Sequence, residues 1–147
     1  NYLTFKLNQE SFAIDAGNVV EIMELPTFTI VPNSSEYIKG ILNFRGEIVP
    51  IINMHKRFKM NDSNNSAKMI IVINLHSDNS KVLLGLLVDD IRNVIEFELK
   101  DIRNVPKSGF SFNVEFLSGM VELNEIFFMM LNIDKVLNLK ELSELTA

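Results

Sequence analysis

Two histidines, His55 and His76, are the side chains of this sequence best suited to acid–base or metal chemistry near neutral pH. The chain has 2 His and no Cys, so a thiolate nucleophile and a cysteine-ligated metal are excluded. Histidines that share a metal usually stand close together in short motifs, whereas these two are far apart in the chain. His55 precedes two basic residues and His76 opens a polar stretch. The sequence therefore predicts two surface histidines and no metal site.

The adjacent carboxylates Asp89 and Asp90 are a second candidate, because paired carboxylates serve as general acid and base. Neighbouring residues of a strand point to opposite faces, so these two would not share a substrate. Strand capping or turn formation is the favoured interpretation. A minor alternative remains, in which Asp89, Asp90 or His55 serves an enzyme or a small-ligand binder in a cleft between two barrels.

No glycine-rich phosphate loop and no nucleophile elbow occurs, and the 6 glycines are isolated. The 7 Met and 11 Phe could line a pocket for an apolar ligand, but ordinary core packing is the favoured interpretation. The sequence therefore predicts a non-enzymatic protein that needs no cofactor.

Arg45 and Glu21 are the charged residues with the most informative surroundings. Arg45 stands at the expected tip of a hairpin with apolar flanks, where a plain surface arginine is also common. Glu21 interrupts an apolar strand, so its carboxylate must face solvent or a partner, and Glu96 repeats that pattern in favour of solvent. Both residues are candidates for binding rather than catalysis.

Composition limits the class of protein. At 147 residues, with 47% hydrophobic and 22% charged residues, the chain fits one globular domain. The net charge of −5 argues against nucleic acid as a partner. The longest near-apolar run, from Ile126 to Leu131, is far below the ~20 residues of a membrane helix, so no membrane insertion is expected. The absence of cysteine fits a reducing compartment, and we expect a cytoplasmic location.

Alternation of apolar and polar residues predicts an all-β chain built largely of hairpins. Pro50 suggests that its strand is an edge strand or carries a bulge. A polar stretch, 59–68, is the expected internal boundary, and helical spacing over 133–145 predicts one C-terminal amphipathic helix. The expected strands are 3–7, 11–15, 19–23, 28–31, 38–44, 47–53, 69–75, 81–88 and the two flanking a second tip near Asn124.

The order of elements repeats along the chain. The stretch from Ile14 to Ile22 resembles the stretch from Val88 to Phe97, and the hairpin around Gly40 resembles the one around Gly119, with a tip one residue shorter. A repeat of this size predicts two small barrels that share a core. The expected subdivision of the single domain, 1–147, is 1–60 plus the C-terminal helix, and 68–132.

The run from Tyr37 to Met54, with its Lys-Gly-x-x-Asn-x-Arg-Gly-x-x-x-Pro spacing, resembles the signature of CheW-like domains, the coupling proteins of bacterial chemotaxis. Further matching blocks occur in the same order at 12–15, 19–22, 31–33 and 85–89. The resemblance covers nearly the whole chain. It implies two five-stranded SH3-like barrels packed side by side, in agreement with the repeat.

The resemblance also implies function. Such domains are adaptors that bridge the cytoplasmic tips of methyl-accepting chemotaxis proteins to the regulatory domain of the histidine kinase CheA. An amphipathic receptor helix would lie in a groove between the barrels, with aliphatic side chains supplying affinity and rim charges setting register. By position in the motifs, the receptor-binding residues would be Val19, Glu21 and Arg45, with Met69 and Val94 across the groove, and the kinase-binding residues Lys39 and Gly40.

The sequence departs from the family pattern at Met23, Phe44 and Asn53, which bears on partner specificity rather than on fold. A second adaptor reading stays open. The chain starts without Met and would then be cut from a longer protein, either a CheW-like domain fused to a receiver or the regulatory region of the kinase itself.

Overall fold

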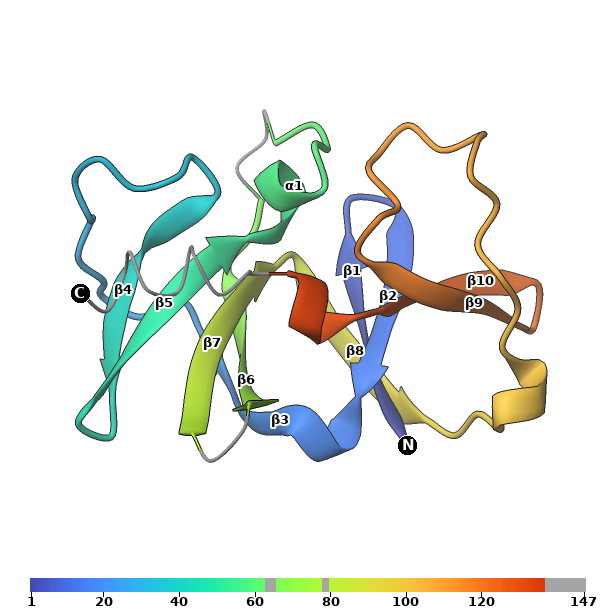
Figure 1. Cartoon of the computed structure of the whole chain (residues 1–147), viewed down its shortest axis with the longest axis horizontal. Coiled ribbons are helices and arrows are strands. Elements are labelled where there is room, and N and C mark those ends of the chain that lie inside the picture. The colour runs from blue at the N-terminus through green and yellow to red at the C-terminus, as the bar shows by residue number, and fades with distance from the viewer. Residues whose placement is uncertain (63–65, 78–79, 137–147) are drawn as a thin grey trace.

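The computed structural model describes residues 1–62, 66–77 and 80–136, and within them the chain forms two five-stranded sheets side by side (Figure 1). The prediction of an all-β fold of two barrels is confirmed. No helix among the described residues is long and apolar enough to cross a membrane.

The first sheet combines strands from both ends of the chain in the order β8-β1-β2-β10-β9. Neighbouring strands in this sheet are antiparallel except for β2 and β10, which run parallel, with Phe12 opposite Met129. The strands are β1 (Tyr2–Leu7), β2 (Glu10–Asp15), β8 (Asp90–Ile95), β9 (Leu117–Leu123) and β10 (Ile126–Leu131).

The second sheet has the equivalent order, β3-β6-β7-β5-β4, with one parallel pair, β5 and β7, in the same place. We call the two sheets, with the side chains that they enclose, the first and the second barrel. The strands of the second are β3 (Val19–Glu24), β4 (Ile38–Phe44), β5 (Glu47–Asn53), β6 (Met69–Ser77) and β7 (Ser80–Val88).

Helices are short. The α-helix α1 spans Met54–Arg57, and 3₁₀ turns span Ala16–Asn18, Leu99–Asp101 and Ile133–Lys135. The first residues of the predicted C-terminal helix form the last of these 3₁₀ turns, and most of its expected length lies outside the described residues.

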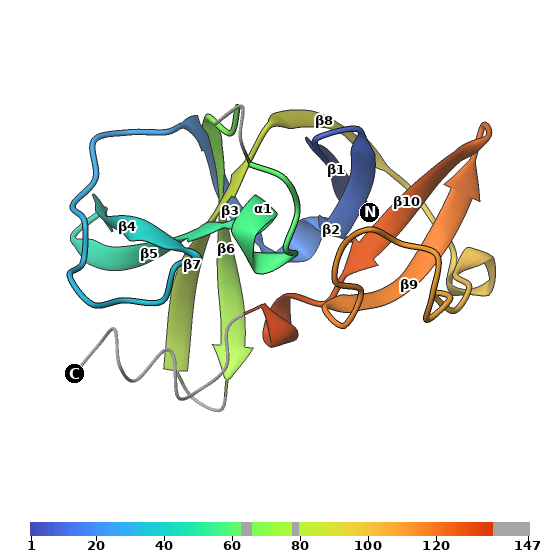
Figure 2. The same ribbon diagram turned by 90° about the horizontal axis from the view of Figure 1, so that it is seen from above.

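The expected division at 59–68 does not separate the barrels. β1 and β2 belong with β8, β9 and β10, so each barrel draws on both halves of the sequence (Figure 2). The polar stretch instead links α1 to β6 inside the second barrel. A polar composition predicts that a loop is present. It does not predict which barrel the flanking strands belong to, because strand pairing depends on contacts between residues far apart in the sequence.

Smaller expectations also change. The two hairpin tips are equally long, with two residues each, Arg45–Gly46 and Asn124–Glu125. The segment around Thr29 forms a single bridge to Ile41 rather than a strand. Pro50 lies in an inner strand, not at an edge, and the parallel ladder to β7 starts one residue later, where a backbone N–H is available.

The register of the repeat differs as well. Ile71 of β6 faces Ile22 of β3, while Leu3 of β1 faces Val94 of β8, so Ile22 and Val94 hold equivalent places. The sequence comparison instead aligned Val19 with Val94. It was wrong because a Val-x-Glu pattern occurs in both stretches, although Glu96 follows β8 and the spacing of the pattern to the preceding strand differs.

Three buried clusters hold the molecule together. The largest includes Phe5 and Phe12 of the first barrel, Ile71 of the second, and Phe58 after α1, so both sheets share it. Each barrel also encloses a smaller cluster of its own. The methionines of β10 are buried at 4% exposure, which supports the interpretation of those residues as core. A shared core fixes the two barrels against each other.

Candidate functional site

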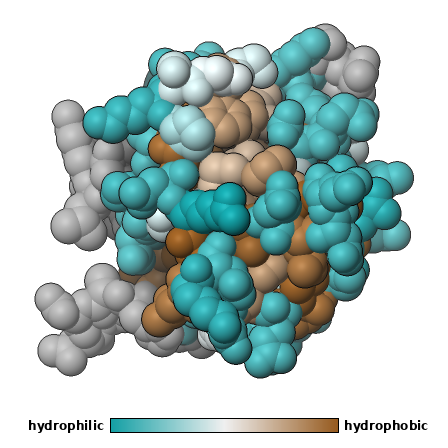
Figure 3. Space-filling view, turned by 90° about the vertical axis from the view of Figure 1, so that its right-hand side faces the viewer, coloured by the Kyte–Doolittle hydropathy of each residue, from teal (hydrophilic) through white to brown (hydrophobic). Residues whose placement is uncertain are grey.

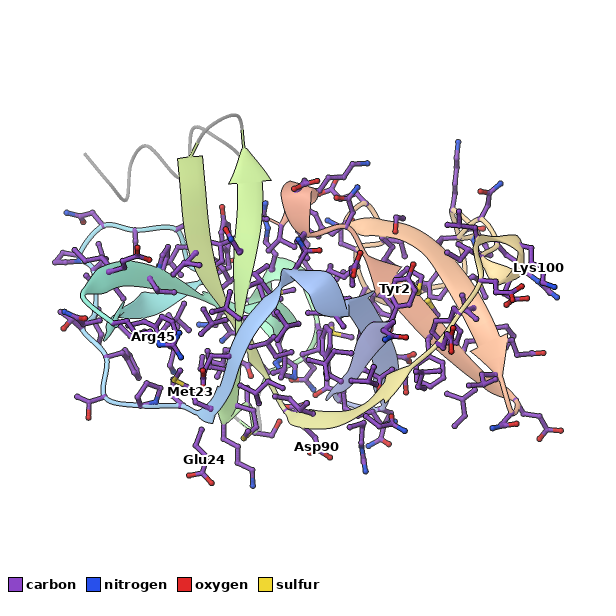
Figure 4. The ribbon with its side chains drawn as sticks, turned by 90° about the horizontal axis from the view of Figure 1, so that it is seen from below. Tyr2, Met23, Glu24, Arg45, Asp90 and Lys100 are labelled. Carbon is purple, nitrogen blue, oxygen red and sulfur yellow. The ribbon has the colours of Figure 1, made fainter. Side chains whose placement is uncertain are left out.

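Arg45 and Glu21 form the most distinctive charged feature of the second barrel. The guanidinium Nη2 donates to Glu21 Oε2 at 3.0 Å, and the side chains are 69% and 38% exposed. Figure 4 shows Arg45 directed toward β3, beside Met23. The sequence placed both residues correctly, one at a hairpin tip and one in a strand, but did not predict that they meet.

The hairpin tip is built to present Arg45. Arg45 has a φ of 52° and Gly46 a φ of 81°, the two positive values of a type I′ turn. Asn43 Oδ1 accepts the Gly46 N–H at 3.0 Å, and the guanidinium lies 4.7 Å from the ring centroid of Phe44. Stacking and the ion pair together hold the arginine across the space between the tip and β3.

Two apolar side chains are also exposed on the strands beside this pair in the sequence. Ile22 on β3 is 40% exposed and Ile48 on β5 is 69% exposed. β3 is an edge strand of its sheet, so part of its backbone is available for pairing as well. An exposed ion pair on strands that also expose apolar side chains is suited to protein recognition, because the apolar area supplies affinity and the charges supply register.

The remaining receptor-binding candidates are more scattered. Val19 and Met69 are half-buried and pack on the shared core from β3 and β6. Val94 is 56% exposed on β8, in the other barrel. The structure therefore brings Glu21 and Arg45 into contact, places Val19 and Met69 at the shared core, and leaves Val94 on a separate strand.

Gly40 is buried, and its surroundings explain the glycine. A Cβ atom there would stand 2.5 Å from the carbonyl oxygen of Thr29 and 2.7 Å from a ring carbon of Phe28. Its neighbour Lys39 is half-buried, with Nζ 5.7 Å from the centre of the Phe28 ring. The segment that approaches Gly40 closely is thus part of the chain itself, and Lys39 is the more accessible of the two kinase-binding candidates.

His55 is buried at 0% exposure, so the prediction of a surface histidine was wrong. Its Nε2 lies 3.0 Å from Asp89 Oδ2, and because an ionised carboxylate only accepts, Nε2 carries the proton in the neutral ring. Nδ1 lies 3.9 Å from Asp62 Oδ1 and has no hydrogen-bond partner among the described residues. The basic neighbours of His55 in the sequence misled the prediction, because Lys56 faces solvent and Arg57 is half-buried while His55 itself points inward.

Asp89 accepts hydrogen bonds from both barrels. We call Asp89 and its partners, Asn8, His55 and Ser66, the joint between the barrels. Asp89 lies between β7 and β8 and accepts the Asn8 N–H at 2.6 Å and the Ser66 hydroxyl at 2.6 Å, in addition to His55. Burial raises the pKa of Asp89, but these hydrogen bonds and the adjacent His55 outweigh it, so its pKa lies below the ordinary value. Asn8 belongs to the first barrel and Ser66 to the loop before β6, so one carboxylate ties both together.

The paired aspartates were predicted to cap a strand or to form a turn. Asp89 agrees with this in part, because it lies between two strands and accepts hydrogen bonds there. Asp90 points elsewhere and pairs with Arg92 at 3.1 Å. A cavity of about 380 Å³ adjoins the joint, lined by Asn8, Gln9, Asn61, Ser66 and Asp89. Within the described residues, no three His, Cys, Asp or Glu side chains are placed to hold a metal ion.

Comparison with known proteins defines the class. Residues 1–141 match the family model of the CheW-like domain. The chain therefore belongs to the CheW-like domain family.

Among its relatives are the chemotaxis proteins CheW of Treponema pallidum, 32% identical over 97% of this chain and 85% of that protein, and of Klebsiella aerogenes, 30% identical over 97% and 84%. The fold is similar to the crystal structure of the scaffolding protein TtCheW from Thermoanaerobacter tengcongensis, with a TM-score of 0.82 and 23% identity over 95% of this chain and 88% of that one.

Proposed function

We propose that this chain is a chemotaxis scaffold that couples the cytoplasmic tips of methyl-accepting chemotaxis proteins to the regulatory domain of the histidine kinase CheA. It would act by binding alone, in the cytoplasm, at membrane receptor arrays. The observation that carries the proposal is the exposed Arg45–Glu21 pair, with Ile22 and Ile48 exposed on β3 and β5, on a chain that belongs to the CheW-like domain family. Such a surface offers partners both charge and apolar area.

The receptor face would combine Glu21 and Arg45 with the aliphatic side chains of Val19, Met69 and Val94. An amphipathic helix would place its apolar stripe on the aliphatic residues and its charges against the ion pair. Because both charges are solvated, their reversal should change association rate and register more than the stability of the domain.

The kinase face would be the surface of Lys39 and the segment that crosses β4 at Thr29. Gly40 would contribute indirectly, since it lets that segment approach the strand closely. A substitution at Gly40 would therefore disturb the fold locally, and Lys39→Glu is the cleaner probe of a kinase contact.

Titration calorimetry with a receptor cytoplasmic tip and, separately, with the CheA regulatory domain tests these assignments. Arg45→Glu should weaken receptor binding by about tenfold and leave kinase binding unchanged, while Lys39→Glu should do the reverse. The double exchange Glu21→Arg with Arg45→Glu keeps the pair and should recover part of the receptor affinity. Lys100→Glu, which breaks a similar exposed ion pair with Glu98 at 3.0 Å, is the matched control. Unchanged receptor binding by a folded Arg45→Glu protein would contradict the assignment.

The alternative that this chain is a domain of a longer coupling protein has one observation in its favour. The chemotaxis protein CheV3 of Helicobacter pylori is 26% identical over 90% of this chain, and the match spans 43% of that protein. The uncut open reading frame decides between the two, because a receiver or a kinase region beside the domain would establish the longer form.

A further inference from the structure

The first barrel has an open mouth. A cavity of about 490 Å³ lies where β8, β1 and β2 face the β9–β10 hairpin tip. Its lining residues are Thr4, Lys6, Ser11, Arg92, Asn93, Ile95, Leu123, Asn124, Ile126 and Phe128. The mouths of β-barrels are common places for binding sites, and this volume is in their usual range.

The equivalent place in the second barrel is filled. In the first barrel, Thr4 pairs with Ala13, and Ala13 pairs with Met130 across the parallel strands. In the second barrel, Val72 pairs with Gly85, and Gly85 pairs with Ile51 across the parallel strands. Thr4 therefore corresponds to Val72. By the same matching, Ser11 corresponds to Leu83 and Leu123 to Phe44, so the second mouth is occupied by three apolar side chains, two of them clearly larger than their counterparts, and each is at most 8% exposed.

The second mouth is also covered and the first is not. Arg45 corresponds to Asn124 at the tip of the other hairpin, and Glu21 corresponds to Asn93 on β8. The Arg45–Glu21 pair spans tip and edge strand at 3.0 Å, whereas two asparagines cannot form an ion pair. Smaller side chains and a missing cover together leave the first mouth open.

The open mouth has a definite chemistry. Its floor contains Ile95 and Phe128, and its rim carries two cations, Lys6 and Arg92, but the lining includes no carboxylate. Arg92 is 57% exposed and shares only a solvated pair with Asp90, which an incoming anion can replace at little cost. The chain as a whole carries a net charge of −5, so this acid-free rim is a local exception.

We propose that the mouth of the first barrel is a docking site for an extended segment of a partner protein in which an apolar side chain is flanked by carboxylates. The apolar side chain enters between Ile95, Leu123 and Phe128, and the carboxylates reach Lys6 and Arg92. The mouth shares no residue with the receptor and kinase faces, although Val94 of the receptor face lies on β8 between Asn93 and Ile95, and the proposal does not depend on those faces.

A protein segment suits the mouth better than a free small molecule. Ligand sites usually enclose most of a small ligand, whereas this mouth opens to solvent and its apolar lining is itself exposed, Ile126 by 50% and Leu123 by 37%. Figure 3, which views the β9–β10 end, shows apolar surface gathered between hydrophilic side chains. A chain segment can cover this apolar surface.

The test uses two-dimensional amide NMR of the whole chain with the synthetic peptide acetyl-Glu-Leu-Glu-Leu-Glu-amide. We expect saturable shifts at Thr4, Asn93 and Ile126, with affinity reduced at least tenfold in the double variant Lys6→Glu, Arg92→Glu. Lys100→Glu, a cation of the same barrel outside the mouth, should bind as the wild type does. Peptides with Lys in place of Glu, or Ser in place of Leu, should not bind.

Three results would overturn the proposal. The first is no saturable shift at millimolar peptide. The second is equal binding by the lysine peptide or by the double variant, which would exclude recognition of carboxylates. The third is equally tight binding of hexanoate, which would make the mouth a small-molecule site instead.

Discussion

The two barrels share one strand order and differ at their mouths. In the second barrel Phe44 fills the opening and the Arg45–Glu21 pair covers it, while in the first barrel Leu123, Asn124 and Asn93 leave it open. The tips of the hairpins that carry these residues are equal in length. The backbone of a duplicated fold can therefore be retained while a few side chains at the tips make one surface charged and closed and the other open.

The joint at His55 and Asp89 connects the barrels, so its loss should have the largest effect. His55→Ala should lower the free energy of unfolding by about 3 kcal/mol, because it removes a buried hydrogen bond to a carboxylate and leaves a cavity. Urea denaturation measures this change. Lys56→Ala, at the exposed neighbour, should stay within about 0.5 kcal/mol, and equal effects of the two variants would contradict a structural role for His55.

The equivalent glycines Gly40 and Gly119 sharpen the comparison. A Cβ at Gly40 meets the backbone oxygen of Thr29 at 2.5 Å, whereas at Gly119 it meets the side chain of Ile102 at 2.6 Å and a backbone oxygen only at 3.0 Å. A side chain relaxes more easily than a backbone. Gly40→Ala should therefore cost about 2 kcal/mol and Gly119→Ala about 1 kcal/mol in thermal unfolding, and the reverse order would contradict this explanation.

Leu123→Phe gives the first mouth the same residue that the second barrel has at the equivalent position, Phe44. Leu123→Phe should fill part of the cavity and change stability by less than about 1 kcal/mol, because the added ring has space that is open to solvent. The same variant should lose binding of the acidic peptide in the NMR titration. Full binding with the ring in place would show that the peptide binds elsewhere.

Acid unfolding tests the joint by another route. Because the pKa of Asp89 is lowered in the folded state, its carboxylate stabilises the fold above the ordinary aspartate pKa, and this contribution is lost as pH falls through the lower folded value. Asp89→Asn should reduce stability near neutral pH and make the acid transition less steep. Asp90→Asn, at an exposed carboxylate, should leave the transition where it is.

The ion pair that covers the second mouth should contribute least to stability. Both charges are exposed, and pairs of this kind contribute about 0–1 kcal/mol. Arg45→Ala should therefore lower the melting temperature by only a few degrees in calorimetry. A large loss would mean that the pair supports the fold rather than recognition.

Local patterns predicted much of the fold. The hairpin over 38–53 was predicted with its observed bounds, since alternation and a glycine at the tip are local signals. The membership of β1 and β2 in the first barrel was not predictable in the same way, because it depends on pairing with β8 and β10, far along the chain.

The candidate site was predictable only in part. Arg45 and Glu21 could be selected because each departs from an apolar pattern, yet their contact depends on how the hairpin lies against β3. The burial of His55 left no local signal, since its partner Asp89 belongs to another strand junction. The open mouth was not predicted either, because it is visible only when equivalent residues of two folded barrels are compared.

The most direct test of the central claim is a bridging measurement with the unmodified chain. An immobilised receptor cytoplasmic tip should retain the CheA regulatory domain only when this chain is added, and Arg45→Glu or Lys39→Glu should each reduce that retention strongly while the protein stays folded. Binding of either partner that excludes the other, or retention of the kinase domain without the chain, would contradict a coupling role.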